Sequence, residues 1–473
     1  MAPAQGRRRI LAVIAPLILA AALPTSSGAG EHGLPESKRV AIKGVDGPGP
    51  ATYDRVWVRK YGPARPRCVL VMVPGGSGGQ GGFAWIAQDI VDRVKGLAVW
   101  AQDRRSNAFE DVSAFVGGNA GDAFDYYLGG GAFGGNTFAP VTGEEAPFVR
   151  EWGAATTLGD LRKVVLEAAE RSGGCVILGG HSFGAVTVPA YAVWDFNGRA
   201  GFRDVDGLVM VDGGLFNAFR DVLIDDFPDF KSVAEARDRI EALQTQTPFG
   251  SDAGSGGPAW LVGVLPELVC DYALESPDAP SALQQNGFGD LILNQPPEFT
   301  VTNEAFAGLF NDQVFALDGA RTGRLAESGD PRPWVDGIHT SMARFCATFV
   351  QEPGNGMEWY FPIRFEIDLA QGMEQMRPTA ITRFLGLRPA HLGRIDNPLY
   401  VLQTELSDGG VLRAAHKLVR KSRIEDPTLI DASNMRHFDP LMDVPAHNRF
   451  LKTVVPFLKQ TIRRSHAARG KGS

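Results

Sequence analysis

The chain lacks the features that mark most membrane, nucleic-acid-binding and disulfide-rich proteins. Of its 473 residues only four are cysteines, and beyond residue 29 no apolar run is long enough to cross a bilayer. Its net charge is −7, with acidic and basic side chains mixed along the chain, so we expect no nucleic-acid partner. The basic cluster from Arg463 to Lys471 is predicted to be a solvated end.

Motifs for metals and phosphates are absent as well. No His-Glu-x-x-His or Cys-x-x-Cys pattern occurs, so we expect no metal site. The glycine-rich stretch Pro74–Gly82 is not followed by Gly-Lys-Ser or Gly-Lys-Thr, which excludes a phosphate-binding loop of that type. The sequence therefore predicts a protein that works without a metal or a cofactor.

Residues 1–29 are typical of an export signal. Arg7–Arg9 supply a positive start, Ile10–Leu23 is apolar but short for a membrane span, and Ser27–Ala29 has the small residues of a cleavage site. We expect a periplasmic or extracellular protein with no stable membrane span after cleavage. The arginine cluster also fits a twin-arginine signal, and an uncleaved anchor is the alternative.

The four cysteines allow three pairings in an exported chain. Cys270 and Cys346 lie in the same part of the sequence, and we favour that pair. Cys68 and Cys175 each begin an apolar run, so they are predicted to be neighbours in a sheet or buried thiols.

Strand and helix patterns alternate in two parts of the chain, which predicts an α/β fold with a mostly parallel sheet covered by helices on both faces. Between them, from 215 to 395, the alternation disappears. Residues 112–155 are rich in Gly, Asn and Phe and have no period, so we expect a long loop or a weakly ordered insertion. The expected strands are 39–43, 53–60, 68–73, 97–101, 175–180, 205–211, 398–403 and 428–432, and the expected helices are 85–94, 157–172, 183–194, 411–421 and 446–458.

The most informative motif is Gly180-His181-Ser182-Phe183-Gly184, which lies between a predicted strand and a predicted helix. This G-x-S-x-G spacing is that of a nucleophile elbow, a sharp turn that lifts a serine oxygen above the edge of a sheet. The two glycines are needed because the backbone packs closely on both sides of the serine. The sequence therefore predicts that Ser182 is a nucleophile.

The order of these elements resembles that of the α/β-hydrolase superfamily over residues 38–215 and 396–460. The resemblance implies a core made of residues 30–214 and 396–473, interrupted by a large, mainly helical insertion (residues 215–395) where that superfamily carries its cap or lid. It also implies that the catalytic histidine follows the last strand. In this chain, that position is His437.

The resemblance leaves the acidic partner of the histidine open. Asp408 lies in the usual loop, 29 residues before His437, whereas Asp212 ends the strand where some members place the acid. Glu405 is a third candidate. For the oxyanion hole, the resemblance implies the backbone N–H of Phe183 and that of Gly75 or Gly76. His181 is expected to orient its neighbours or to fill space.

These features predict a secreted serine hydrolase that cleaves an ester or related acyl bond of a small molecule, similar to a carboxylesterase. One alternative is a peptidase like the proline iminopeptidases, acting on a peptide substrate. Another is a binding protein that keeps the fold without catalysis. Trp359, Tyr360 and Phe361 are expected to line an apolar pocket or to form the core of the insertion.

Overall fold

The computed structural model describes residues 33–219, 229–250, 258–315, 319–350 and 354–470. The predicted export signal, residues 1–29, lies outside this part of the chain. No helix within the described ranges combines the length and the apolar character needed to cross a membrane.

An eight-stranded sheet forms the centre of the core, in the order β1-β2-β4-β3-β7-β10-β15-β16. Only β1 and β2 are antiparallel to their neighbours, and the six strands from β4 to β16 are parallel. The predicted α/β fold is therefore confirmed. The strands are β1 (Lys38–Lys43), β2 (Arg55–Tyr61), β3 (Cys68–Val73), β4 (Leu97–Gln102), β7 (Val176–His181), β10 (Gly207–Val211), β15 (Leu399–Gln403) and β16 (Thr428–Asp431).

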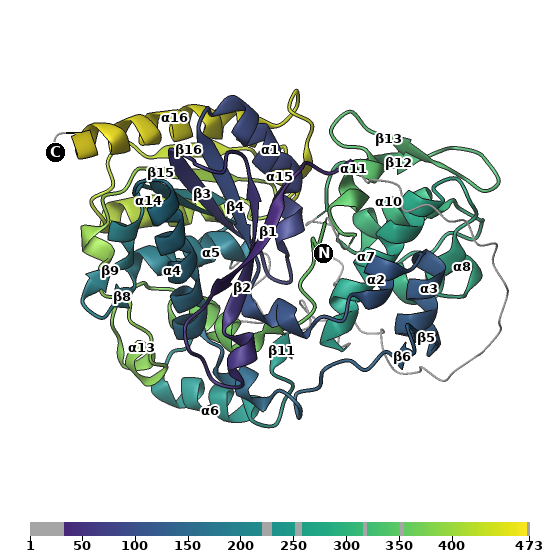
Figure 1. Cartoon of the computed structure of the whole chain (residues 1–473), viewed down its shortest axis with the longest axis horizontal. Coiled ribbons are helices and arrows are strands. Elements are labelled where there is room, and N and C mark those ends of the chain that lie inside the picture. The colour runs from purple at the N-terminus through teal and green to yellow at the C-terminus, as the bar shows by residue number, and fades with distance from the viewer. Residues whose placement is uncertain (1–32, 220–228, 251–257, 316–318, 351–353, 471–473) are drawn as a thin grey trace, which may run out of the picture.

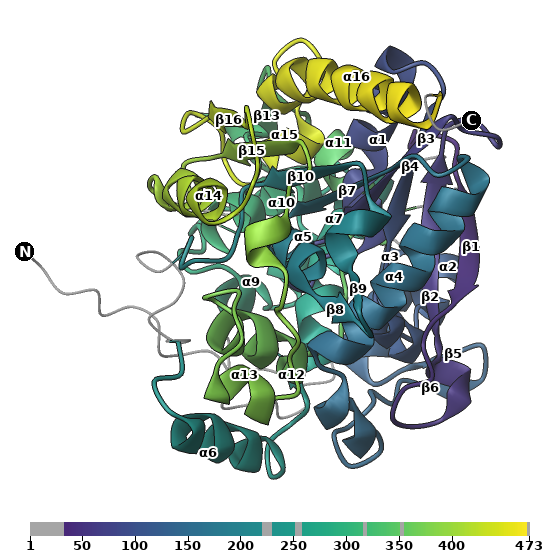
Figure 2. The ribbon, with the colours of Figure 1, turned by 90° about the vertical axis from the view of Figure 1, so that its left-hand side faces the viewer.

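Helices cover both faces of this sheet, as Figure 2 shows. Along β3, Leu70 and Met72 join one hydrophobic core, whereas Val69 and Val71 join the other. A strand with two buried faces has to be apolar throughout, which explains its uninterrupted run. One face carries α1 (Ala84–Arg93) and α16 (Arg449–Gly470), and the other carries α4 (Ala154–Arg171), α5 (Phe183–Val193) and α14 (Gly410–Lys421).

The disulfide corrects our favoured pairing. Cys68 and Cys175 are joined, because they stand where the adjacent parallel strands β3 and β7 begin. The N–H of Val69 donates to the carbonyl oxygen of Cys175 at 3.0 Å, a distance typical of hydrogen bonds between neighbouring strands. Cys270 and Cys346 are buried free thiols.

The glycine-rich stretch 112–155 is not the long loop that its composition predicts. It forms short elements whose aromatic side chains are buried or partly buried: Phe115 stacks on Tyr127 with ring centroids 4.6 Å apart. Residues 120–124 also pack against α7 (Ala259–Glu275) of the insertion, and these contacts order a stretch with no period of its own. The elements are α2 (Ser113–Gly117), α3 (Ala120–Phe124), β5 (Ala132–Phe133), β6 (Asn136–Thr137) and two single helical turns, Asp125–Gly129 and Pro147–Glu151.

The insertion contributes two groups of helices (Figure 1). The larger group, with α7, α10 and α11 in mutual contact, lies to the right of the sheet together with α2 and α3. The smaller group pairs α6 with α13 below the core. The helices are α6 (Val233–Leu243), α7 (Ala259–Glu275), α8 (Ala282–Gln285), α9 (Gly289–Ile292), α10 (Asn303–Gln313), α11 (Met342–Ala347), α12 (Ile363–Glu366) and α13 (Ala380–Phe384).

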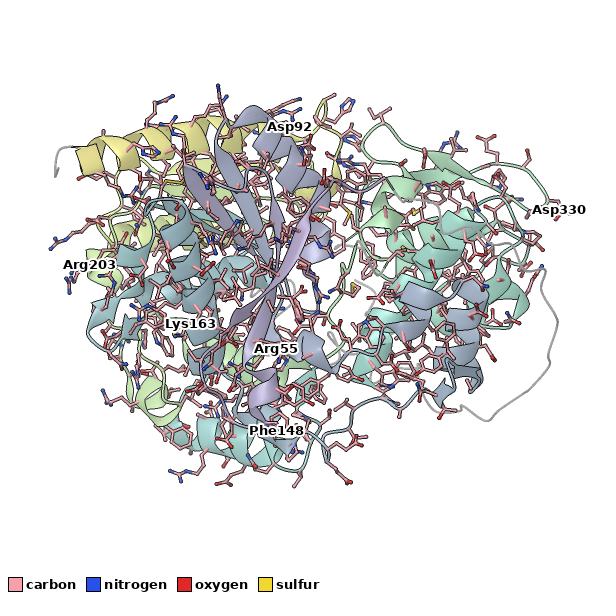
Figure 3. All side chains as sticks on the ribbon, viewed as in Figure 1. Arg55, Asp92, Phe148, Lys163, Arg203 and Asp330 are labelled. Atoms are coloured by element: carbon pink, nitrogen blue, oxygen red, sulfur yellow. A yellow bond between two sulfur atoms is a disulfide. The ribbon has the colours of Figure 1, made fainter. Side chains whose placement is uncertain are left out.

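Among the described residues, four pairs of short strands lie outside the main sheet. In Figure 3, Asp330, between β12 and β13, and Arg203, just before β10, mark opposite ends of the molecule. The larger helix group of the insertion thus forms one end of the molecule. The remaining elements are β8 (Asp195–Phe196), β9 (Arg199–Ala200), β11 (Phe249–Gly250), β12 (Gly323–Leu325), β13 (Trp334–Asp336), β14 (Phe361–Pro362) and α15 (Asp439–Met442).

Candidate active site

Ser182 stands on a sharp turn between β7 and α5. Its backbone has φ 56° and ψ −123°, a conformation that costs energy for a residue with a side chain. The two flanking glycines are required by space: a Cβ on Gly180 would overlap the carbonyl of Gly184, and a Cβ on Gly184 would overlap that of Val73. The local sequence therefore builds the predicted elbow and holds the strained serine in place.

His437 and Asp212 meet beside this elbow. His437 lies in the loop after β16, and its Nδ1 is 2.5 Å from Oδ2 of Asp212, the residue that follows β10. Both side chains are buried, with 3% and 0% of their surface exposed. The N–H of Ser182 donates to the carbonyl of Val211 at 2.9 Å, so the elbow and the aspartate sit on hydrogen-bonded neighbours.

The other two candidate acids do not reach the histidine. Glu405 and Asp408 are both exposed, and Asp408 stands in the turn that begins α14, with φ 43°. The structure therefore places Asp212, and neither of these residues, where a carboxylate could hold the imidazole. Sequence spacing alone could not separate them, because the ends of neighbouring parallel strands meet in space at very different chain separations.

Thr404 is a partner of Asp212 that the sequence analysis did not single out. Its N–H donates to Asp212 Oδ1 at 2.8 Å, and its hydroxyl donates to Oδ2. Burial by itself would raise the pKa of Asp212, but the hydrogen bonds from His437 and Thr404 outweigh it and lower that pKa. Asp212 is thus an ionised acceptor, which favours a proton on Nδ1 of His437 and leaves Nε2 unprotonated, as a base requires.

His181 has the orienting position expected for it. Its Nε2 is 2.9 Å from the main-chain oxygen of His437, and the two rings are 4.3 Å apart. Burial, together with the neighbouring His437, lowers the pKa of His181 to about 3, so its ring is neutral. Because a carbonyl oxygen can only accept, Nε2 of His181 carries the proton and anchors the backbone of His437.

Asp439 anchors the same loop from the other side. Its Oδ2 accepts the N–H of Arg436 at 2.7 Å, and its Oδ1 accepts the N–H of Arg321 at 2.8 Å. Since Arg321 belongs to the insertion, this contact ties the histidine loop to it. Asp439, only two residues after His437 in the chain, thus fixes the position of the loop that carries this histidine.

The predicted oxyanion donors lie on two sides of Ser182. Phe183 is the first residue of α5, so its N–H has no acceptor within the helix. Gly75 lies against the serine: a Cβ at that position would be 3.0 Å from Cβ and 3.4 Å from Oγ of Ser182. A Cβ on Gly76 would meet nothing within 4 Å, so this side of the glycine loop (Pro74–Gly82) faces open space.

The aromatic run Trp359–Phe361 of the insertion is divided between two environments. Trp359 and Tyr360 are fully buried and belong to the insertion's core, where Trp359 Nε1 donates to Glu267 at 3.1 Å. Phe361 instead packs on Phe183, with ring centroids 5.5 Å apart, as does Phe365 at 5.3 Å. The insertion thus contacts the residue next to the candidate nucleophile.

Among the described residues, no group of three or more His, Cys, Asp or Glu side chains is placed to hold a metal ion. The constellation of Ser182, His437 and Asp212 has the parts for proton transfer from a hydroxyl to an imidazole that a carboxylate orients.

No protein-family model matches the chain, and no curated protein is similar to it in sequence. Among solved structures, it is similar to a provisionally named lipase from Sulfolobus solfataricus, at 14% identity and a TM-score of 0.51, over 91% of this chain and 94% of that one. It is also similar to an epoxide hydrolase from Vigna radiata (12% identity, TM-score 0.43, 92% and 100% covered) and a carboxyl esterase from Bacillus coagulans (13%, 0.41, 90% and 99%). Likenesses at such identities concern the fold and leave the reaction open. The order of the sheet, the elbow after β7 and the likeness to the Sulfolobus solfataricus structure together show that the chain has the α/β-hydrolase fold.

Proposed function

We propose that the chain is an exported serine hydrolase that cleaves an ester or related acyl bond through Ser182, His437 and Asp212. The observation that carries this proposal is the 2.5 Å contact between His437 Nδ1 and Asp212 Oδ2, next to the strained elbow of Ser182. An apolar side chain would fill this buried position at a lower cost in free energy than an ionised aspartate. Packing therefore does not explain Asp212, whereas fixing the tautomer of the histidine does.

In the first half of the reaction, Oγ of Ser182 attacks the carbonyl carbon of the substrate while Nε2 of His437 takes its proton. The carboxylate of Asp212 stabilises the imidazolium that forms. The negative charge on the carbonyl oxygen is bound by the N–H of Phe183 and an N–H of Gly75 or Gly76. One such donor typically contributes about 3–4 kcal/mol to the stability of the transition state.

When the tetrahedral intermediate collapses, the imidazolium returns its proton to the leaving alcohol, and the acyl group stays on Ser182. Water then attacks the acyl carbon, with His437 as base, and the second collapse releases the acid and restores the serine hydroxyl. His181 and Thr404 take no proton in this scheme. They hold the backbone of His437 and the carboxylate of Asp212 in place.

Export is part of the proposal because two independent features support it. The sequence of residues 1–29 is typical of a signal, and the Cys68–Cys175 disulfide suits an oxidising compartment. When the chain is expressed with residues 1–29, the protein should be recovered outside the cytoplasm. Its intact mass should be that of a chain that begins at Gly30. Recovery of the full-length chain in the cytoplasm would contradict this.

The reaction is tested by comparing p-nitrophenyl acetate with proline 2-naphthylamide in the wild type and in Ser182→Ala. We expect the wild type to hydrolyse the ester faster than the amide, and Ser182→Ala to lose this activity by a factor on the order of 10⁴–10⁶. Ser433→Ala is the matched control, since Ser433 is exposed in the loop that carries His437. It should keep wild-type activity.

The outcomes separate the candidate functions. Faster cleavage of the proline amide, lost in Ser182→Ala, would favour the iminopeptidase. Full ester hydrolysis in a folded Ser182→Ala would overturn the proposed mechanism. A wild type that hydrolyses neither compound and resists serine-directed reagents would point to a binding protein.

A further inference from the structure

Arg104 is a buried arginine that holds the glycine loop from behind. It follows the end of β4, and only 3% of its side chain is exposed. Its Nη2 donates to the carbonyl oxygens of both Pro74 and Gly75, each at 2.8 Å. Two successive carbonyls therefore converge on one nitrogen atom.

This contact sets the direction of two N–H groups. In a trans peptide, the carbonyl and the N–H of the next residue point in opposite directions. Among the described residues the only cis peptide is Asp330–Pro331, so both peptides of this loop are trans. With the carbonyls of Pro74 and Gly75 drawn to Arg104, the N–H groups of Gly75 and Gly76 point away from it. These are the two candidates for the second oxyanion donor, beside the N–H of Phe183.

The charge of Arg104 also strengthens these donors. A carbonyl that accepts a hydrogen bond polarises its peptide, so the N–H at the other end becomes a better donor. The contact is buried, where such effects are larger than in water. Arg104 thus orients the donors and increases their positive charge without touching the substrate.

Glu358, in the insertion, completes the arrangement. Its carboxylate accepts from Arg104 Nη1 through one oxygen and from the hydroxyl of Ser106 through the other, and it is fully buried. Its own N–H donates to the carbonyl of Ser77 at 2.7 Å. Glu358 therefore both neutralises Arg104 and binds the glycine loop directly.

The backbone around Glu358 runs beside the glycine loop like an added strand. The N–H of Gly79 donates to the carbonyl of Gly356 at 2.7 Å, and that of Gly81 to the carbonyl of Asn355 at 2.8 Å. Gly78 and Met357 form an antiparallel bridge. The glycine loop is thus held between the end of β4 and a segment of the insertion.

We propose that Arg104 and Glu358 are positioning residues for the oxyanion hole, and that the insertion supports catalysis through this ion pair. The inference rests on the proposed function, because it assigns the glycine loop to stabilising charge on a carbonyl oxygen. A purely structural ion pair would stabilise the fold without favouring the transition state over the substrate, and that difference can be measured.

The neighbouring residue Arg105 supplies a matched control. It is as buried as Arg104, with 4% exposed, and it is also paired with carboxylates, those of Asp54 and Asp160. Its partners lie in the core, and its only backbone acceptor among the described residues is the carbonyl of Val45. Arg105→Lys therefore removes the same chemistry at the same depth without touching the glycine loop.

The test compares Arg104→Lys, the neutral double variant Arg104→Met with Glu358→Gln, and Arg105→Lys. For each we would measure kcat and KM for p-nitrophenyl acetate and the inhibition constant of a trifluoromethyl ketone. This ketone adds to Ser182 as a tetrahedral oxyanion, while the proton of Ser182 moves to His437, so it reports the oxyanion hole directly. Thermal unfolding gives the stability of each variant.

We expect Arg104→Lys to lower kcat about 10–100-fold with KM within about twofold, because a misplaced group costs that much in rate. The inhibition constant of the ketone should rise by the same factor. The double variant leaves no charge buried alone and should give the same pattern. Arg105→Lys should lower the unfolding temperature while kcat and the inhibition constant stay unchanged.

If both Arg104 variants failed to fold, Ser106→Ala would serve, since it removes one donor to Glu358 and keeps the ion pair. It should give a fall in kcat of about two- to fivefold and a matching rise in the inhibition constant. Folded Arg104 variants with wild-type kcat and wild-type ketone binding would overturn this inference. The proposed function would still stand in that case, provided that Ser182→Ala is inactive. An equal loss in Arg105→Lys would also overturn it.

Discussion

The core and the insertion differ in how their residues reach the candidate site. In the core, each candidate side chain lies at or beyond the end of a strand: Ser182 directly follows β7, Asp212 directly follows β10, and His437 lies in the loop after β16. In the insertion, Glu358 meets Arg104 across 254 residues of sequence, and no regular element leads to it. In the proposed mechanism, the reacting groups belong to the core. The support of the glycine loop, and the contact with Phe183, belong to the insertion.

The largest effect expected from this division concerns the acid. Asp212→Asn keeps the shape of the side chain but removes the charge that favours a proton on Nδ1 of His437, so kcat should fall about 10⁴-fold. Asp408→Asn is the matched control, since the side chain of Asp408 is exposed and makes no hydrogen bond to His437 among the described residues. This control variant should have a kcat within about twofold of the wild-type value, because exposed substitutions away from a site usually have little effect. Steady-state kinetics on p-nitrophenyl acetate provides both values.

This pair of variants would also break the comparison if it failed. Should Asp408→Asn inactivate the enzyme and Asp212→Asn remain active, the acid would lie one strand further along the sheet. The core would then reach the site through an exposed turn and not through a strand end.

A smaller effect concerns the cysteines of the two regions. The Cys68–Cys175 disulfide closes a loop of 107 residues in the core, and a disulfide of this kind typically adds about 2–4 kcal/mol to the free energy of unfolding. Replacing both residues with Ala should lower stability by this amount. Cys270→Ala with Cys346→Ala, in the insertion, removes only buried thiol volume and should cost less.

A reducing agent separates the two cases. Dithiothreitol should lower the unfolding temperature of the wild type and of the Cys270 and Cys346 variant, but not that of the Cys68 and Cys175 variant. If dithiothreitol affected the latter, a second disulfide would be present, and the pairing first favoured for Cys270 and Cys346 would be restored.

Most of the core could be predicted from sequence because its strands are buried on both faces. Cys68–Val73 is uninterrupted and apolar for that reason, and the turn after 176–181 shows itself through two glycines at a fixed spacing. Helix ends were less accurate: α4 begins at Ala154 and α16 continues to Gly470, because the two ends depend on tertiary packing.

Site residues could be predicted only where the local sequence contains a motif or a characteristic position. Ser182 and His437 were predicted through a motif and a position, although their catalytic roles stay predictions. Asp212 could not be separated from Asp408, since their distance from His437 depends on the order of the strands. Arg104 and Glu358 gave no signal, because a buried ion pair between distant segments leaves no pattern in either.

The same reason explains why the insertion was hard to interpret. Residues 112–155 have no hydrophobic period, yet they fold into short elements, of which α3 packs on α7 and α2 packs on α3. Their order comes from a neighbour more than a hundred residues away and not from local preference. Trp359 and Phe361 stand two positions apart, and only the fold assigns one to a core and the other to Phe183.

The central claim, that Ser182 is the nucleophile activated by His437 and Asp212, is tested most directly by covalent labelling. A fluorophosphonate probe would be incubated with the folded wild type, Asp212→Asn and Asp408→Asn, and the modified peptide identified by mass spectrometry. The account predicts a single adduct on Ser182, formed rapidly in the wild type and in Asp408→Asn and far more slowly in Asp212→Asn. No adduct on Ser182 in the folded wild type, or equal rates in all three proteins, would contradict it.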